Sequence, residues 1–83
     1  MNRLVALHEF QPQEKDELPM EKGQIMIGHS IDEEGWRTGE DPSTGETGHF
    51  PAIFVAKEGS EKAEKVLRKL AKKLSRIKKK GGS

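Results

Sequence analysis

The 83-residue sequence contains no cysteine and no tyrosine, and its aromatic residues are limited to one tryptophan and three phenylalanines. The absence of cysteine excludes a disulfide framework and any thiolate metal site. No apolar run is long enough for a signal peptide or for a helix that spans a bilayer. A small cytoplasmic domain with room for an appendage is therefore expected, and association with a membrane surface is the alternative location.

Signatures of catalysis and of metal binding are also missing. The three histidines, His8, His29 and His49, do not have the spacing of zinc ligands. His8 and Glu9 are adjacent, but a catalytic site needs a base, a partner and a pocket together, and the sequence supplies no such set. A phosphate-binding loop of the GxxxxGK[ST] type is not present either. We therefore expect no enzyme activity, no cofactor and no metal.

The net charge of +1 conceals two segments of opposite sign. Residues 1–60 carry five basic and twelve acidic side chains, which gives a net charge of −7. Residues 61–83 carry ten basic and two acidic side chains, which gives +8. Such an asymmetry indicates separate roles for the two segments or attraction between them.

Short apolar segments separated by turn residues fill the first sixty residues. We expect strands over residues 4–7, 25–27, 36–40, 46–50 and 54–56. Residues 41–45 (DPSTG) form a strong turn signal between the third and fourth of these strands. The expected core residues are Val5, Leu7, Leu18, Ile25, Ile27, Phe50 and Val55. Closely spaced short strands with glycine and proline between them predict a small sandwich or barrel, and closure into a barrel would remove open edges.

The hydrophobic period changes after Gly59. Apolar residues three and four positions apart predict an amphipathic helix from Glu61 to about Lys79, with Ser60 as the N-cap. The expected contact face of this helix consists of Ala63, Val66, Leu67, Leu70, Leu74 and Ile77. We therefore divide the chain into a barrel (1–58), a basic amphipathic helix (59–80) and a linker or engineering scar (81–83).

Four motifs of the first segment resemble signatures of the SH3 domain family. Residues 6–10 (ALHEF) resemble the opening ALYDY motif, and residues 16–23 (DELPMEKG) resemble the DELSFxKG motif that closes the RT loop. Gly35-Trp36 stands where the family carries a tryptophan after the n-Src loop, and residues 48–55 (GHFPAIFV) resemble GxFPxNYV. The resemblance covers residues 3–58 and implies a mainly β, five-stranded SH3-like barrel, here followed by one C-terminal α-helix. It also implies a non-enzymatic protein-interaction module of the kind found in signalling adaptors.

The resemblance further implies a groove for proline-rich peptides, whose polyproline II helix is preformed and loses little entropy on binding. The groove residues carried over from the family are His8, Phe10, Trp36, Pro51, Ile53 and Phe54. The acids carried over to the specificity pocket, where they would pair with an Arg or Lys of the ligand, are Glu14, Asp16, Glu17 and one of Glu33 and Glu34. Composition alone would place these acids on a solvated loop face, and the resemblance favours the binding role.

Three groove positions depart from the family pattern. Tyrosine is usual where His8 and Phe54 stand, and asparagine is usual where Ile53 stands. The usual side chains donate hydrogen bonds to ligand carbonyls, and each lost bond weakens binding by about 0.5–1.5 kcal/mol. Two or three such losses move a micromolar affinity toward the millimolar range. We therefore expect a weakly bound proline-rich peptide, or an atypical peptide or protein ligand.

The apolar stripe of the helix has heptad spacing and needs a surface to cover it. Four surfaces are open at this stage: its own barrel, a second copy in a homodimer, another protein, or an anionic membrane. A solvated spacer before a neighbouring domain and an engineered segment are further interpretations. Nucleic acid is disfavoured because no aromatic residues lie among the lysines. The alternative function is an anionic membrane anchor, in which the basic helix binds and the barrel is a passive scaffold.

Overall fold

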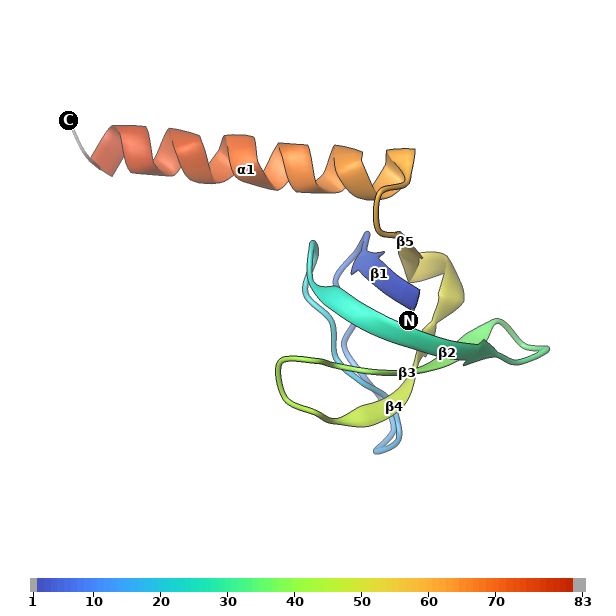
Figure 1. The fold of residues 1–83 in the computed structure, drawn as a ribbon. Helices are drawn as coiled ribbons and strands as arrows, with labels where there is room; N and C mark the ends of the chain where they lie inside the picture. The colour runs from blue at the N-terminus through green and yellow to red at the C-terminus, as the bar shows by residue number, and fades with distance from the viewer. Residues whose placement is uncertain (1, 82–83) are drawn as a thin grey trace.

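The computed structural model describes the backbone of residues 2–81 and the side chains of residues 2–75. Its elements are β1 (Asn2–Ala6), β2 (Ile25–Ile31), β3 (Trp36–Glu40), β4 (Thr47–Pro51), the 3-10 turn η1 (Ala52–Phe54), β5 (Val55–Lys57) and α1 (Glu61–Gly81). The strands pair antiparallel in the order β4-β3-β2-β1-β5 (Figure 1). The predicted fold class, a mainly β five-stranded domain with one C-terminal helix, is confirmed.

Several element boundaries differ from the predicted ones. β2 continues to Ile31 through Gly28 and two polar residues, because backbone pairing with β3 around a bulge extends it beyond its apolar part. Phe54 lies in η1, so the last strand begins at Val55. α1 continues to Gly81, which the sequence had assigned to the linker, and Gly82 and Ser83 lie outside the described residues.

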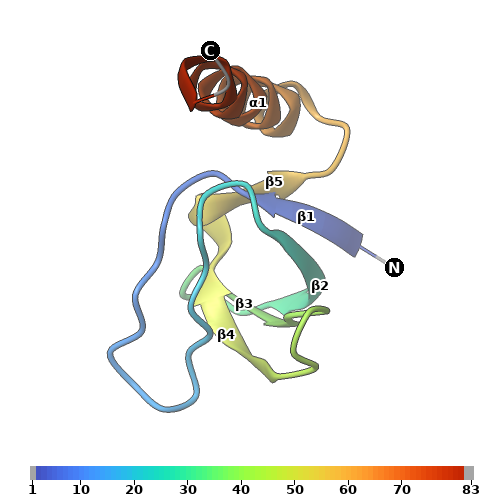
Figure 2. The same cartoon turned by 90° about the vertical axis from the view of Figure 1, so that its left-hand side faces the viewer.

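The sheet curls around one apolar cluster (Figure 2). The buried members of this cluster are Leu4, Ala6, Leu18, Met20, Met26 and Phe50. Of the expected core residues, Val5, Leu18, Ile27 and Phe50 are buried, whereas Leu7, Ile25 and Val55 are half-buried. Met20 and Met26, which are 2% and 0% exposed, were not among the expected core residues. Side chains alternate along a strand, so Met26 points inward while its neighbours in β2 point outward.

The helix α1 covers the outer face of β1 and β5 (Figures 1 and 2). Val5 is paired in register with Ile25 of β2 and Ala56 of β5, so these three side chains share that outer face. Val5 and Ala63 are both fully buried. The first turns of α1 therefore close a second, smaller apolar layer on the outside of the barrel.

The start of α1 is fixed by its N-cap. Ser60 Oγ accepts a hydrogen bond from the Ala63 N–H at 3.4 Å, and the Ser60 carbonyl accepts one from the Glu64 N–H at 2.9 Å. The Ser60 N–H itself donates to the Lys57 carbonyl at 3.0 Å. These bonds satisfy backbone groups that a helix start leaves unpaired, and they join α1 directly to the end of β5.

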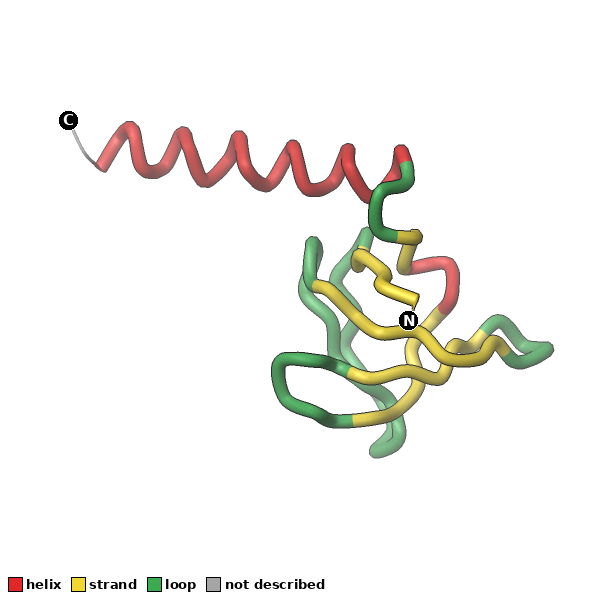
Figure 3. The backbone as a smooth tube through the Cα atoms, in the orientation of Figure 1, coloured by secondary structure: helices red, strands yellow, loops and turns green. Residues whose placement is uncertain are grey.

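The apolar stripe of α1 is covered by the barrel only along its first half. Leu70 lies so close to Gly23 that a Cβ at position 23 would overlap it, and Gly23 also has a φ of +88° that favours glycine. Val66, Leu67 and Leu70 are half-buried, whereas Leu74 is 67% exposed because the helix projects beyond the barrel (Figure 3). The side chain of Ile77 lies outside the described residues. None of the helices described between residues 2 and 81 combines the length and apolarity needed to cross a membrane.

Asp41 anchors the turn between β3 and β4. Its Oδ1 accepts hydrogen bonds from the Ser43 N–H at 2.9 Å and the Ser43 hydroxyl at 2.6 Å, and its Oδ2 accepts one from Gln24 Nε2 at 2.9 Å. Burial acts to raise the pKa of Asp41, but the hydrogen bonds from Ser43, Gln24 and the Thr44 N–H together bring it below its ordinary value. The ionised carboxylate is therefore the form that stabilises the fold.

We expect Leu70→Ala to lower the free energy of unfolding by about 1–2 kcal/mol, because a half-buried leucine loses part of its transfer free energy. Leu74→Ala, on the same stripe of the same helix, should change it by less than about 0.5 kcal/mol because that side chain is exposed. Denaturant unfolding followed by the fluorescence of Trp36 measures both. Equal losses for the two variants would contradict the docking of α1 described above.

We expect stability to fall in acid partly through Asp41. Its folded-state pKa lies below the ordinary value of 3.8, so its contribution is complete above that value and is lost as the pH falls through the folded pKa. Asp41→Asn should lower the free energy of unfolding by about 1–2 kcal/mol at neutral pH, and this difference should shrink in acid. Glu46→Gln, which removes an exposed carboxylate of the same hairpin, is the control at neutral pH. A difference that is unchanged between pH 7 and pH 2 would rule out this role.

Candidate ligand-binding groove

Four rings from separate parts of the chain form a continuous row, which we name the aromatic row. The ring centroids of His8 and Phe54 are 5.4 Å apart, those of Phe54 and Phe10 are 6.0 Å apart, and those of Phe10 and Trp36 are 5.9 Å apart. All three pairs are edge-to-face, an arrangement that aromatic rings favour. His8 and Trp36 therefore stand at opposite ends of the row.

Backbone hydrogen bonds place the first three rings. The Leu7 N–H donates to the Phe54 carbonyl at 2.7 Å, which brings the next residue, His8, beside η1. Phe10 and Met20 exchange two backbone bonds of 2.9 and 3.0 Å. This pair joins the two arms of the RT loop, the long connection between β1 and β2 (residues 7–24), and holds Phe10 between Phe54 and Trp36.

Trp36 is held by the n-Src loop, residues 32–35, and by β4. Asp32 Oδ1 accepts hydrogen bonds from the Glu34 N–H at 2.8 Å and the Trp36 N–H at 2.9 Å, and the Asp32 N–H donates to the Trp36 carbonyl at 2.8 Å. Trp36 pairs with Pro51 in the β3–β4 ladder. The tryptophan is half-buried, so part of its ring remains available to a ligand.

Pro51 and Ile53 complete the predicted apolar set. Pro51 is half-buried at the end of β4, and Ile53 is 80% exposed in η1. An isoleucine this exposed in a short rigid turn contributes little to the core. The structure thus brings His8, Phe10, Trp36 and Phe54 together and places Pro51 and Ile53 beside them.

The predicted acids are spread over two loops. Glu17 Oε1 accepts hydrogen bonds from the backbone N–H groups of Gln13 at 2.8 Å and Glu14 at 3.3 Å, so this carboxylate turns back into the RT loop. Asp16 Oδ2 lies 3.8 Å from His49 Nε2 in β4. The exposed acids are Glu14 and Asp16 in the RT loop and Glu33 and Glu34 in the n-Src loop. Glu17 therefore supports the loop, and the exposed acids remain open to a ligand.

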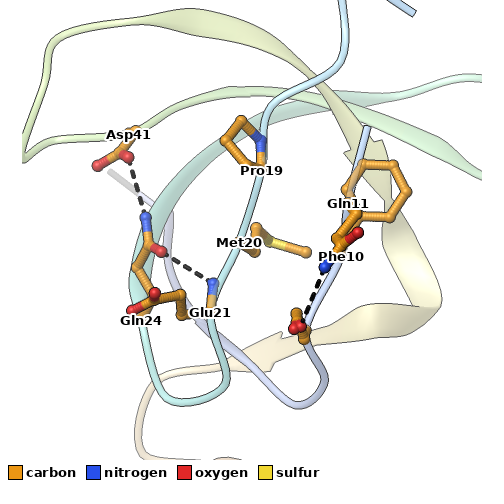
Figure 4. A pocket seen from close by; sticks show the side chains of 8 residues that line it. Phe10, Gln11, Pro19, Met20, Glu21, Gln24 and Asp41 are labelled. Atoms are coloured by element: carbon orange, nitrogen blue, oxygen red, sulfur yellow. Dashed lines mark hydrogen bonds between the residues drawn. The ribbon is translucent and has the colours of Figure 1, made fainter. Parts of the chain in front are cut away.

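A hollow of about 370 Å³ lies between the arms of the RT loop and the start of β2 (Figure 4). Its lining residues are Glu9, Phe10, Gln11, Pro19, Met20, Glu21, Gln24 and Asp41. Gln24 Nε2 donates to Asp41, and Gln24 Oε1 accepts from the Glu21 N–H at 3.0 Å, so the polar groups at one side of the hollow are paired with each other (Figure 4). Phe10 lines this hollow and also belongs to the aromatic row. Because Gln24 and Asp41 are hydrogen-bonded to each other and to nearby groups, we interpret both residues as structural rather than catalytic.

A second cleft, of about 350 Å³, lies where α1 passes the barrel. Its lining residues are Leu7, His8, Lys22, Ile53, Lys62, Lys65, Val66 and Lys69. We name it the lysine cleft. The lysines of the helix were not among the predicted site residues. The spacing of Lys62, Lys65 and Lys69 places them on one face of a helix, but only the docking of α1 determines which face meets His8.

Comparison with known proteins supports the resemblance. A family model described as SH3 domain matches residues 5–52. Nostrin from Rattus norvegicus is 48% identical over 50 residues, which cover 60% of this chain and 10% of Nostrin, and Nostrin from Homo sapiens gives the same values. The E3 ubiquitin-protein ligase SH3RF2 from Rattus norvegicus is 36% identical over 64 residues, which cover 77% of this chain and 9% of the ligase. The chain thus spans about a tenth of the length of these relatives.

Solved structures show the same likeness. The SH3 domain of yeast NBP2 matches with a TM-score of 0.65 at 33% identity, over 69% of this chain and 97% of that domain. The C-terminal SH3 domain of Myosin IB from Entamoeba histolytica, bound to an EhFP10(GEF) peptide, matches with a TM-score of 0.61 at 28% identity, over 68% and 90% of the two chains. Because the family model runs from β1 to the end of β4 and covers more than half of the chain, this chain belongs to the SH3 domain family, whose members are non-catalytic protein-interaction modules.

Proposed function

We propose that the aromatic row binds a proline-rich peptide, or an atypical peptide in an extended conformation. The observation that carries this proposal is the spacing of the rings, which is 5.4 to 6.0 Å from each to the next. A polyproline II helix rises about 3.1 Å per residue, so each step of the row corresponds to about two ligand residues. The peptide bound to the myosin SH3 domain supports a peptide ligand for this related fold.

The groove is apolar but poor in hydrogen-bond donors. With no tyrosine in the sequence, the donors within the row are Trp36 Nε1 and the imidazole of His8. Ile53 offers an exposed apolar surface where a polar amide is usual in the family. The ligand is therefore held mainly by the burial of apolar surface, and its affinity is lower than that of a groove with the full donor set.

Exposed acids near Trp36 favour a basic residue at that end of the ligand. Glu33 and Glu34 are exposed in the loop that holds Trp36, and Asp16 is exposed in the RT loop. An Arg or Lys of the ligand can pair with them, and each such exposed pair contributes about 0.2–1 kcal/mol. These acids act mainly on orientation, and the rings supply most of the binding free energy.

We expect Trp36→Ala to weaken the binding of a proline-rich peptide by at least about tenfold, because an aromatic anchor at a binding surface typically contributes 2 kcal/mol or more. Ile31→Ala is the matched control. Ile31 is 56% exposed, and it pairs with Arg37, so it lies on the opposite face of the sheet from Trp36. Amide chemical shifts during the titration should move around residues 8–17, 33–36 and 50–54. Unchanged affinity in Trp36→Ala would show that the groove is assigned to the wrong surface.

We expect the triple variant His8→Tyr, Ile53→Asn and Phe54→Tyr to bind ordinary PxxP peptides more tightly. Each restored donor should contribute about 0.5–1.5 kcal/mol, so the triple variant should gain about tenfold or more in affinity. Isothermal titration with one peptide and both proteins gives the comparison. No gain in a correctly folded triple variant would mean that the missing donors do not limit binding.

A further inference from the structure

The lysine cleft adjoins the groove at the end opposite Trp36. His8 and Ile53 line the cleft, and His8 is also the last ring of the aromatic row. A peptide that runs along the row past His8 therefore enters the space between the barrel and α1. The helix extends the groove beyond the part that the barrel alone provides.

The cleft has an apolar floor and a basic rim. Leu7, Ile53 and Val66 supply the apolar surface, and the four lysines are exposed around it. None of the side chains that line the cleft is acidic, and the ion pairs found among residues 2–75 do not involve these lysines. Four clustered lysines with no acidic side chain among the lining residues favour an anionic group at this cleft.

The docking of α1 fixes the backbone positions from which these lysines extend. Ala63 is fully buried against the barrel, and Leu70 rests on Gly23, so the rotation of the helix about its axis is set at both ends of the cleft. Lys22 meets the helix from the barrel side, one residue before Gly23. The basic rim is thus built by two elements that are held together, rather than by a solvated helix face alone.

We propose that the lysine cleft binds acidic residues that flank the peptide core held by the aromatic row. This proposal rests on the peptide-binding function proposed above and names the chemistry of the ligand further. The groove is then polarised, with lysines beyond His8 and exposed acids beside Trp36. The matching ligand is acidic at one end, apolar and proline-rich in the middle, and basic at the other end. With about 3.1 Å per ligand residue, the acidic residues follow within a few positions of the residue that covers His8.

The placement of α1 favours a peptide over an anionic membrane. An amphipathic helix that lies on a bilayer inserts its apolar face among the lipids. Here the apolar face from Ala63 to Leu70 packs on the barrel, and only Leu74 of the described stripe is largely exposed. The lysines also surround an apolar floor, and an extended chain can contact the floor and the lysines together.

The test uses the intact chain and two fluorescent peptides. Both carry the same proline-rich core with an arginine at one end, and the other end carries three aspartates in one peptide and three asparagines in the second. We expect the aspartate peptide to bind about three- to tenfold more tightly at low salt. This gain should fade as salt is raised, because the screening length shortens from about 10 Å at 0.1 M to about 3 Å at 1 M.

Two matched triple variants locate the effect. Lys62→Gln, Lys65→Gln and Lys69→Gln remove three charges of the cleft, and Arg68→Gln, Lys72→Gln and Lys73→Gln remove three charges of the same helix outside it. Glutamine has nearly the helix propensity of lysine, so circular dichroism should show α1 intact in both. We expect the first variant to bind the aspartate and asparagine peptides with nearly equal affinity. The second variant should still bind the aspartate peptide more tightly. The asparagine peptide should bind both variants with the affinity that it has for the parent.

The outcomes separate the two proposals. Equal loss of the gain in both variants would show general charge attraction and would overturn the assignment of the cleft. Binding of both peptides with equal affinity to the parent would overturn it as well, and the peptide function of the row would stand. If neither peptide bound the parent, both the peptide-binding role of the aromatic row and the role of the lysine cleft would be overturned. A lipid surface would be the better assignment if the parent bound phosphatidylserine vesicles, the first variant did not, and the aspartate peptide bound no more tightly than the asparagine peptide. That result would overturn the proposal.

Discussion

The docking of α1 and the shape of the lysine cleft both depend on the burial of Val5 beneath the first turns of α1. Leu4 and Ala6, on either side of Val5, point into the barrel, so β1 contributes to an inner and an outer apolar layer at once. A chain of this size has few residues for a core, and the use of both faces of one strand adds burial without adding length. The same contact places the basic helix where its residues form one side of the lysine cleft.

The groove rests on the core, because Phe10 and Phe54 of the aromatic row pack against the core cluster, whereas His8 and Ile53 are exposed. The rings of the aromatic row are placed by backbone bonds at η1, across the RT loop and in the n-Src loop, whereas Met20, Met26 and Phe50 fill the interior. Substitutions at the exposed residues His8 and Ile53 can therefore change recognition while the interior keeps the fold. Because His8 and Ile53 are exposed, and because Phe54 keeps the apolar ring of the usual tyrosine, the sequence can depart from the family at these three positions and still fold as an SH3 domain.

The order and spacing of four motifs were sufficient to identify the resemblance to the SH3 family, and that resemblance, rather than composition or periodicity, predicted the five-stranded barrel and the four residues of the aromatic row. The sequence did not indicate which side chains of β2 face the core, because Ile25, Met26 and Ile27 are all apolar. Only the register with β1 shows that Met26 points inward. The helix period predicted the apolar stripe, but Leu70 and Leu74 are equivalent in the sequence. Their different exposure depends on where the barrel ends, which no local pattern contains.

Gly23 belongs to the RT loop and to the helix contact at the same time. Its N–H donates to the Ala6 carbonyl at 2.8 Å and so closes the base of the RT loop, and Leu70 of α1 rests on its backbone. Glycine at position 23 therefore meets two requirements at once, because its positive φ lets the chain turn toward β2 and its lack of a side chain leaves room for Leu70. A single substitution at this position would disturb the end of the RT loop and the docking of α1 together.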